Sequence, residues 1–131
     1  MSSESLYERV GGREFFVGLV DTFYAAVAEQ PLLREMYPED LQPAATRLCA
    51  FLVQYFGGPP DYEALRGEPR LRMRHFEFGI DKAARDTWFA CMAAAVASSG
   101  ADPESAETLL SYFEATSTFL INRGGLALKG R

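Results

Sequence analysis

Histidine and cysteine are scarce in this 131-residue sequence, which has one histidine, His75, and two cysteines, Cys49 and Cys91. Neither cysteine belongs to a Cys-x-x-Cys pair, and each falls within an apolar helical pattern, where a free thiol behaves as a small hydrophobic group. A zinc site would need both cysteines, the histidine and a carboxylate together. The composition therefore argues against structural zinc and against a disulfide scaffold.

Basic residues are also fewer than acidic ones: the sequence has 13 lysines and arginines and 18 aspartates and glutamates, which gives a net charge of −5. That charge opposes attraction to nucleic acid and to anionic lipid. No apolar run approaches the roughly 18 residues that a membrane span needs, and the N-terminus lacks the basic start and apolar core of a signal peptide. We expect a cytoplasmic protein with no membrane span and no nucleic-acid partner.

Apolar residues recur at helical spacing along two segments of the first half. One segment, 13–29, follows a pair of glycines, and the other, 41–55, stops at the sequence GGPP at 57–60, which no helix would cross. The inward positions are predicted to be Phe16, Leu19, Val20, Phe23 and Val27 in the first segment, and Leu41, Ala44, Ala45, Leu48, Leu52 and Tyr55 in the second.

Two more helices are predicted in the second half, each after an aspartate that can cap its N-terminus. Asp81 opens a helix that fades at 98–100, and Asp102, followed by a first-turn proline, opens one that runs to about Asn122. No strand pattern and no fixed repeat competes with the helices. The sequence therefore predicts an all-α fold in a single domain over 1–131, with its core at about 5–122.

Proline, glycine and charged residues fill most of 59–74, so a long loop is expected there. A short helical turn is predicted at 70–75, with His75 at its end. The glycine-rich segment 123–131 is expected to be a frayed tail.

The single histidine and three polar aromatic residues are the candidates for chemistry. A neutral imidazole can bind haem iron, although composition alone favours the alternative that one histidine near three arginines is a solvated loop residue. Tyr24, Tyr37 and Trp88 each carry a hydrogen-bond donor on a large apolar body and could line one pocket. Buried aromatic residues are, however, more often plain core. Composition and spacing leave these alternatives open.

Five stretches carry a family resemblance: YERVGG at 7–12, FYAAV at 23–27, YPEDL at 37–41, FLVQYFGGP at 51–59 and PRLRMRH at 69–75. Over about 5–122 the chain resembles the group II truncated haemoglobins. The resemblance implies a two-over-two helical sandwich around haem b. It also implies that His75 is the protein ligand of the iron, and that Tyr24, Tyr37 and Trp88 act on a ligand bound to the opposite face.

The resemblance implies a cofactor-binding set as well. Ala44 stands where many globins have histidine or glutamine, and it cannot donate a hydrogen bond. Arg47 and Arg72 are candidates to hold the haem propionates, because a guanidinium matches a carboxylate in shape and charge. Leu48 and Phe51 would supply an apolar wall. The other cofactor-binding candidates are Tyr55, Tyr62, Met73 and Phe78.

The expected function is reversible binding of dioxygen, with nitric oxide, carbon monoxide or peroxide as other reactants at the same iron. One alternative is a haem oxidoreductase that carries out nitric oxide dioxygenation or peroxide reduction. The sequence has no G-x-G-x-x-G fingerprint, so turnover would need an external electron donor. A second alternative is a helical sensor or interaction module without haem. Whether the chain forms a homo-oligomer is left open.

Overall fold

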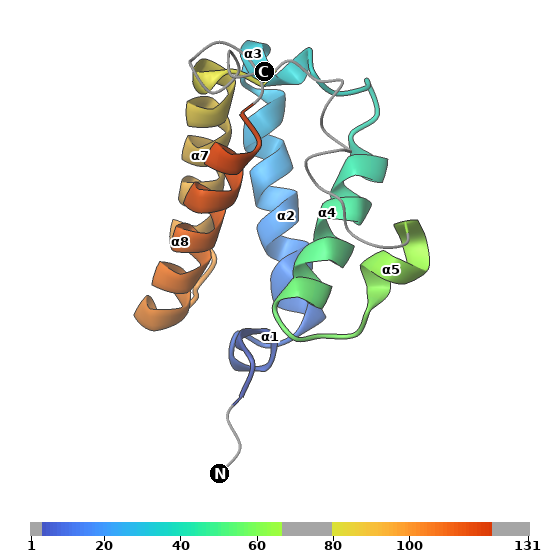
Figure 1. Ribbon diagram of the computed structural model, residues 1–131, viewed down its shortest axis with the longest axis vertical. Helices are drawn as coiled ribbons and strands as arrows, with labels where there is room; N and C mark the ends of the chain where they lie inside the picture. Colours follow the sequence, from blue (N-terminus) through green and yellow to red (C-terminus); the bar gives the residue numbers. More distant parts are fainter. Residues whose placement is uncertain (1–3, 67–79, 122–131) are drawn as a thin grey trace.

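The computed structural model describes residues 4–66 and 80–121, and this described part consists of helices and connections without a strand (Figure 1). The all-α prediction is confirmed. The helices, labelled as in Figure 1, are α1 (Leu6–Arg9), α2 (Arg13–Ala28), α3 (Pro31–Arg34), α4 (Gln42–Tyr55), α5 (Asp61–Arg66), α7 (Lys82–Ala97) and α8 (Pro103–Phe119).

Helix α2 lies at the centre of the core. Its five predicted inward residues are each at most 2% exposed. One side of α2 packs against α4 and another against α7, while α7 packs against α8 (Figure 1). These pairs of helices form the two-over-two arrangement that the resemblance implied.

Both predicted aspartate caps are present. The Asp81 carboxylate accepts a hydrogen bond from the backbone N–H of Ala84 at 2.8 Å, and Asp102 accepts one from Ser105 at 3.0 Å. Each cap satisfies a backbone donor that has no partner within its own helix. Helix α8 ends at Phe119, slightly before the expected end.

The segment predicted as a long loop from residue 59 contains a short helix, α5, so that part of the prediction is wrong. Helix α5 is too short to form an apolar stripe of its own, and contacts with α4 stabilise it instead. Tyr62 is 4% exposed and packs edge-on against Phe51 of α4, with 5.4 Å between ring centroids. The Gln54 side chain accepts from the Glu63 backbone at 3.0 Å and donates to the Glu63 carboxylate at 3.2 Å.

Two further short helices have no counterpart in the predicted pattern. Helix α1 starts with a capping box between Ser5 and Glu8, a serine followed three residues later by glutamate. Helix α3 starts at Pro31 and is held by Leu33, which is 2% exposed. The turn predicted at 70–75 and the tail predicted at 123–131 lie outside the described residues.

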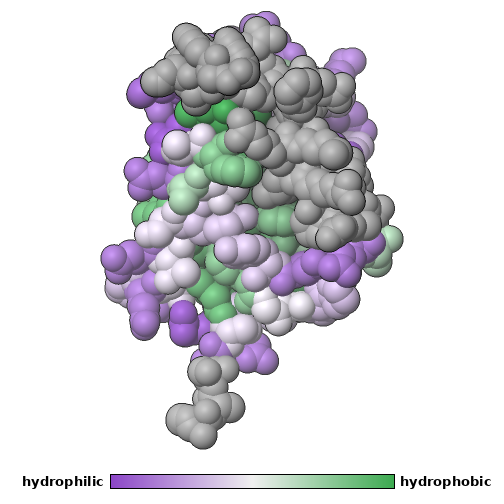
Figure 2. Space-filling view, in the orientation of Figure 1, coloured by the Kyte–Doolittle hydropathy of each residue, from purple (hydrophilic) through white to green (hydrophobic). Residues whose placement is uncertain are grey.

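Within the described ranges, no helix is both long and apolar enough to cross a membrane. Figure 2 shows hydrophobic surface in a hollow between α8 and α4, with hydrophilic side chains around it. The hollow is an apolar groove whose lining includes Phe51, Tyr55, Tyr112 and Phe119. Tyr55 was predicted to point inward, but this prediction is wrong, because its side chain is 55% exposed. Tyr55 is the last residue of α4, and its ring lies beside Tyr112 in the groove, with 4.4 Å between centroids.

Alanine substitutions at two glycines should change the free energy of unfolding in opposite directions. A Cβ at Gly58 would lie 2.7 Å from Cε1 of Tyr7 and 2.8 Å from Cγ1 of Val53, so Gly58→Ala should cost about 1–3 kcal/mol, as overpacking does. A Cβ at Gly18, on the exposed side of α2, would meet nothing within 4 Å. Gly18→Ala should therefore stabilise the fold by roughly 0.5–1 kcal/mol. Urea denaturation measures both, and a shift of the same sign in both variants would contradict this packing.

Candidate functional site

A cavity of about 490 Å³ opens among α2, α4, α7 and α8, within the size range of small-molecule sites. Most of its lining is apolar, and a few polar side chains are spaced around it. The lining residues are Tyr24, Leu33, Met36, Tyr37, Pro38, Ala44, Arg47, Leu48, Phe51, Leu52, Tyr62, Ile80, Ala84, Arg85, Trp88, Tyr112, Phe113, Thr116, Ser117 and Leu120.

Three polar aromatic residues meet at this cavity, and we call Tyr24, Tyr37 and Trp88 the Tyr–Tyr–Trp cluster. The rings of Tyr24 and Tyr37 lie edge to face, with 5.5 Å between centroids. Phe23 of α2 packs edge-on against Trp88 at 5.0 Å and so ties the indole to the helix that carries Tyr24. The structure therefore brings together, from two helices and a connecting segment, all three residues that the sequence selected.

Burial governs the protonation of both phenols. It raises the pKa of Tyr24 above the ordinary value, and the neighbouring Tyr37 raises that pKa further, whereas the charge of Arg47 opposes the shift. Burial also raises the pKa of Tyr37, while hydrogen bonds with Tyr24 and Trp88 lower that pKa in part. The net shifts are upward, so both hydroxyls keep their protons at neutral pH.

One direction of donation follows from chemistry alone. An indole N–H can only donate, so the Tyr37 oxygen accepts in its hydrogen bond with Trp88. Tyr24 and Tyr37 are hydrogen-bonding neighbours as well. Each phenol carries an O–H that can donate to a molecule in the cavity.

Helix α4 supplies an apolar wall. Ala44 and Phe51 are each 8% exposed, and Leu48 is half-buried because it faces the cavity. Ala44 brings no polar group, so polar contacts on this side must come from elsewhere. Tyr62 reaches the cavity from α5, whereas Tyr55 lies outside it in the groove.

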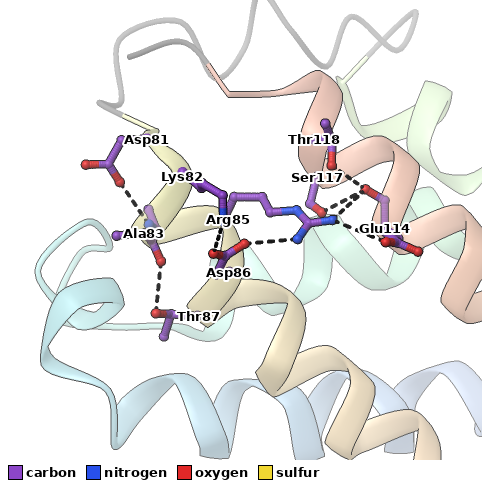
Figure 3. A network of polar contacts seen from close by, with 10 residues as sticks. Asp81, Lys82, Ala83, Arg85, Asp86, Thr87, Glu114, Ser117 and Thr118 are labelled. Carbon is purple, nitrogen blue, oxygen red and sulfur yellow. Dashed lines mark hydrogen bonds and ion pairs between the residues drawn. The ribbon is translucent and has the colours of Figure 1, made fainter. Parts of the chain in front are cut away.

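Two arginines also line the cavity. Arg47 is half-buried on α4 and forms no ion pair with a carboxylate in the described ranges. Arg85 joins α7 to α8 (Figure 3), donating to Asp86 at 3.0 Å and lying 3.8 Å from a carboxylate oxygen of Glu114. The Nε of Arg85 is buried without a hydrogen-bond partner among the described residues. The cavity thus has one unpaired guanidinium and one unused N–H at its border.

Comparison with known proteins decides the family. The bacterial-like globin family matches residues 5–122. The group 2 truncated haemoglobin YjbI of Bacillus subtilis is 41% identical over 117 residues, covering 89% of this chain and 88% of that protein. This chain belongs to the group II truncated haemoglobins.

Solved structures of other truncated haemoglobins and related proteins have the same fold. The thermostable haemoglobin of Thermobifida fusca superposes with a TM-score of 0.91 at 43% identity, covering 93% of this chain and 100% of that one. The truncated oxygen-avid haemoglobin of Bacillus subtilis gives a TM-score of 0.87 at 40% identity, covering 91% of this chain and 100% of that one.

Haem is the cofactor of truncated haemoglobins, and the residues of this cavity fit it. A macrocycle needs apolar walls, which Leu48 and Phe51 supply from α4 and Phe113 from α8. Its carboxylates would need cationic donors, and two are present: the Nε–H of Arg85 and the guanidinium of Arg47, neither of which has a carboxylate partner for that group among the described residues.

Four predicted residues of this truncated haemoglobin, Arg72, Met73, His75 and Phe78, lie outside the described residues, and their roles stay predictions. In the part of the chain that the structure describes, no three His, Cys, Asp or Glu side chains gather as a metal site. The prediction of an iron ligand therefore depends on His75.

Several cavity residues were missed from the sequence. Arg85 stands three positions before Trp88, a spacing that shares one helix face and could have identified it. Leu33 and Met36 belong to a short segment without periodicity, so no pattern could have selected them. Tyr112 and Ser117 lie on α8, and only the packing of helices shows that they reach the cavity.

Proposed function

We propose that this truncated haemoglobin binds haem b through His75 and binds dioxygen reversibly beside the Tyr–Tyr–Trp cluster. The observation that carries the proposal is the meeting of Tyr24, Tyr37 and Trp88 at one largely apolar cavity, where the two phenol rings lie edge to face with 5.5 Å between centroids. The oxygen-avid relative of Bacillus subtilis, at 40% identity, supports dioxygen as the ligand.

The haem iron would supply the atom at which a diatomic ligand binds. The chain's own residues create the surroundings of that ligand. Phe51, Leu48 and Ala44 limit water on one side of the cavity, which strengthens any hydrogen bond formed inside. Tyr37 donates to the partly negative ligand, while Tyr24 and Trp88 hold the Tyr37 oxygen in place.

Absorption spectroscopy tests the proposal most directly. Protein purified with haem should show a Soret band, and the reduced form should bind dioxygen reversibly. A preparation that cannot retain haem would favour the helical module without cofactor. Consumption of nitric oxide or peroxide over many cycles with an added reductase would instead assign the protein to the haem oxidoreductases.

Replacement of His75 by glycine should remove the iron ligand, since the chain has no other imidazole. We expect His75→Gly to retain haem weakly and to recover the parental ferrous spectrum when free imidazole is added. Optical titration of the apoprotein with haem, with and without imidazole, measures both effects. Parental haem affinity and spectrum in the variant would refute the assignment.

Replacement of Arg47 by alanine should speed haem loss without changing the ligand spectrum. A charged hydrogen bond to a propionate is worth about 1.5–3 kcal/mol when partly shielded. Transfer of haem to an acceptor protein gives the rate. Lys82→Ala is the matched control, because Lys82 is an exposed cation paired with Asp86 outside the cavity lining. Equal rates in the two variants would remove Arg47 from the propionate site.

Loss of the Tyr37 hydroxyl should speed dioxygen release. If the lost hydrogen bond is worth about 1.5–3 kcal/mol and about 1.4 kcal/mol corresponds to tenfold, Tyr37→Phe should release dioxygen roughly 10- to 150-fold faster. Tyr24→Phe and Trp88→Phe should have smaller effects that do not add to it, because both residues act through Tyr37. Carbon monoxide, which is less polar when bound, should respond less.

Stopped-flow release measures these rates. Tyr7→Phe is the matched control, since Tyr7 stacks on Phe16 away from the cavity and should leave the rate unchanged. If Tyr37→Phe and Tyr7→Phe release dioxygen at the same rate, the Tyr37 hydroxyl has no role in holding the ligand.

A further inference from the structure

We infer that Arg34 is a positioning residue for Tyr37. Its guanidinium holds the backbone that carries Tyr37, so that the phenol stays within reach of Tyr24, Trp88 and a ligand in the cavity. The inference deepens the proposed function and rests on it. Arg34 itself does not line the cavity.

The contacts of Arg34 form a clamp on three successive carbonyl groups. Nη1 donates to the carbonyl of Pro38 at 2.9 Å and to that of Tyr37 at 3.5 Å, and Nη2 donates to the carbonyl of Glu39 at 2.5 Å. A guanidinium presents its N–H groups in a rigid planar fork, so several carbonyls can be held in one geometry. The orientation of residues 37–39 is thereby fixed relative to α3.

Apart from the Tyr37 side chain, few hydrogen bonds from other described residues hold the backbone of the clamped segment. Between the end of α3 and the start of α4 it forms no regular helix, and Pro38 has no N–H to donate. The backbone N–H of Tyr37 donates to the Arg34 carbonyl at 3.2 Å. Arg34 therefore holds this segment through both its backbone and its side chain.

Arg34 is itself anchored to the helices that carry the two partners of Tyr37. Its neighbour Leu33 is 2% exposed and lines the cavity. Helix α3 packs against α2, which carries Tyr24, and against α7, which carries Trp88. A shift of the Arg34 clamp would move Tyr37 relative to both of its hydrogen-bond partners at once.

The test compares dioxygen and carbon monoxide release from the haem-loaded protein in Arg34→Ala, Arg34→Lys and Tyr37→Phe, and in the double variant of Arg34→Ala with Tyr37→Phe. Arg13→Ala is the matched control, because Arg13 forms an exposed ion pair with Asp61 and has no contact with the clamped segment. Haem content and far-ultraviolet circular dichroism confirm that each variant is folded.

We expect Arg34→Ala to speed dioxygen release about 3- to 30-fold, part of the effect of losing the Tyr37 hydroxyl, and to change carbon monoxide release less than about twofold. In the Tyr37→Phe background the same substitution should add no further change. Arg34→Lys should recover part of the parental rate, because an ammonium can donate to some of these carbonyls without the planar fork. Arg13→Ala should match the parent.

Three results would overturn the inference. A parental dioxygen rate in Arg34→Ala would show that the clamp does not position Tyr37. An equal acceleration of both gases, or an undiminished effect of Arg34→Ala in the Tyr37→Phe background, would show general loosening of the fold. If Arg34→Ala does not retain haem, Arg34→Lys takes its place in these comparisons, and the same three results in Arg34→Lys overturn the inference.

Failure of the proposed function looks different. In that case the parent protein does not bind dioxygen, or Tyr37→Phe releases it at the parental rate, and Arg34 then has no ligand contact to control. Failure of the inference alone leaves the Tyr37→Phe effect intact and removes only the effect of Arg34→Ala.

Discussion

The contacts of Tyr37 with Tyr24 and Trp88 join helix α2, helix α7 and the segment after α3 at one cavity. They can form only if α2 and α7 pack closely and if the segment after α3 turns toward both helices. The apolar face of α2 meets the first condition, and Leu33 with the Arg34 clamp meets the second. The polar chemistry of the cavity therefore depends on the packing of apolar residues around it.

Low polarity around the Tyr–Tyr–Trp cluster determines what its hydroxyls can do. A phenol is protonated at neutral pH in any case, and desolvation raises the pKa of both tyrosines further, so they stay donors even in alkaline solution. The same low polarity strengthens each hydrogen bond inside the cavity. The charge of Arg47 on α4 partly opposes the rise in the pKa of Tyr24.

Much of the fold could be predicted because its long helices bury regular stripes. The inward face of α2 and the caps at Asp81 and Asp102 follow from spacing and residue type alone. Helices α3 and α5 could not be predicted, because side chains of other elements stabilise them. The cluster residues were selected as polar aromatic residues and given their role by the resemblance, but their meeting at one cavity depends on how the helices pack. Arg34 and Arg85 act through contacts that no periodicity encodes.

Connections between helices usually tolerate insertions, because little depends on their exact path. The connection from α3 to α4 is different, because three of its successive carbonyl groups accept hydrogen bonds from the one guanidinium of Arg34. One extra residue there would offset every carbonyl from its donor and turn the phenol away from the indole. The length of this segment, and not only its side chains, therefore determines where the Tyr37 ring lies.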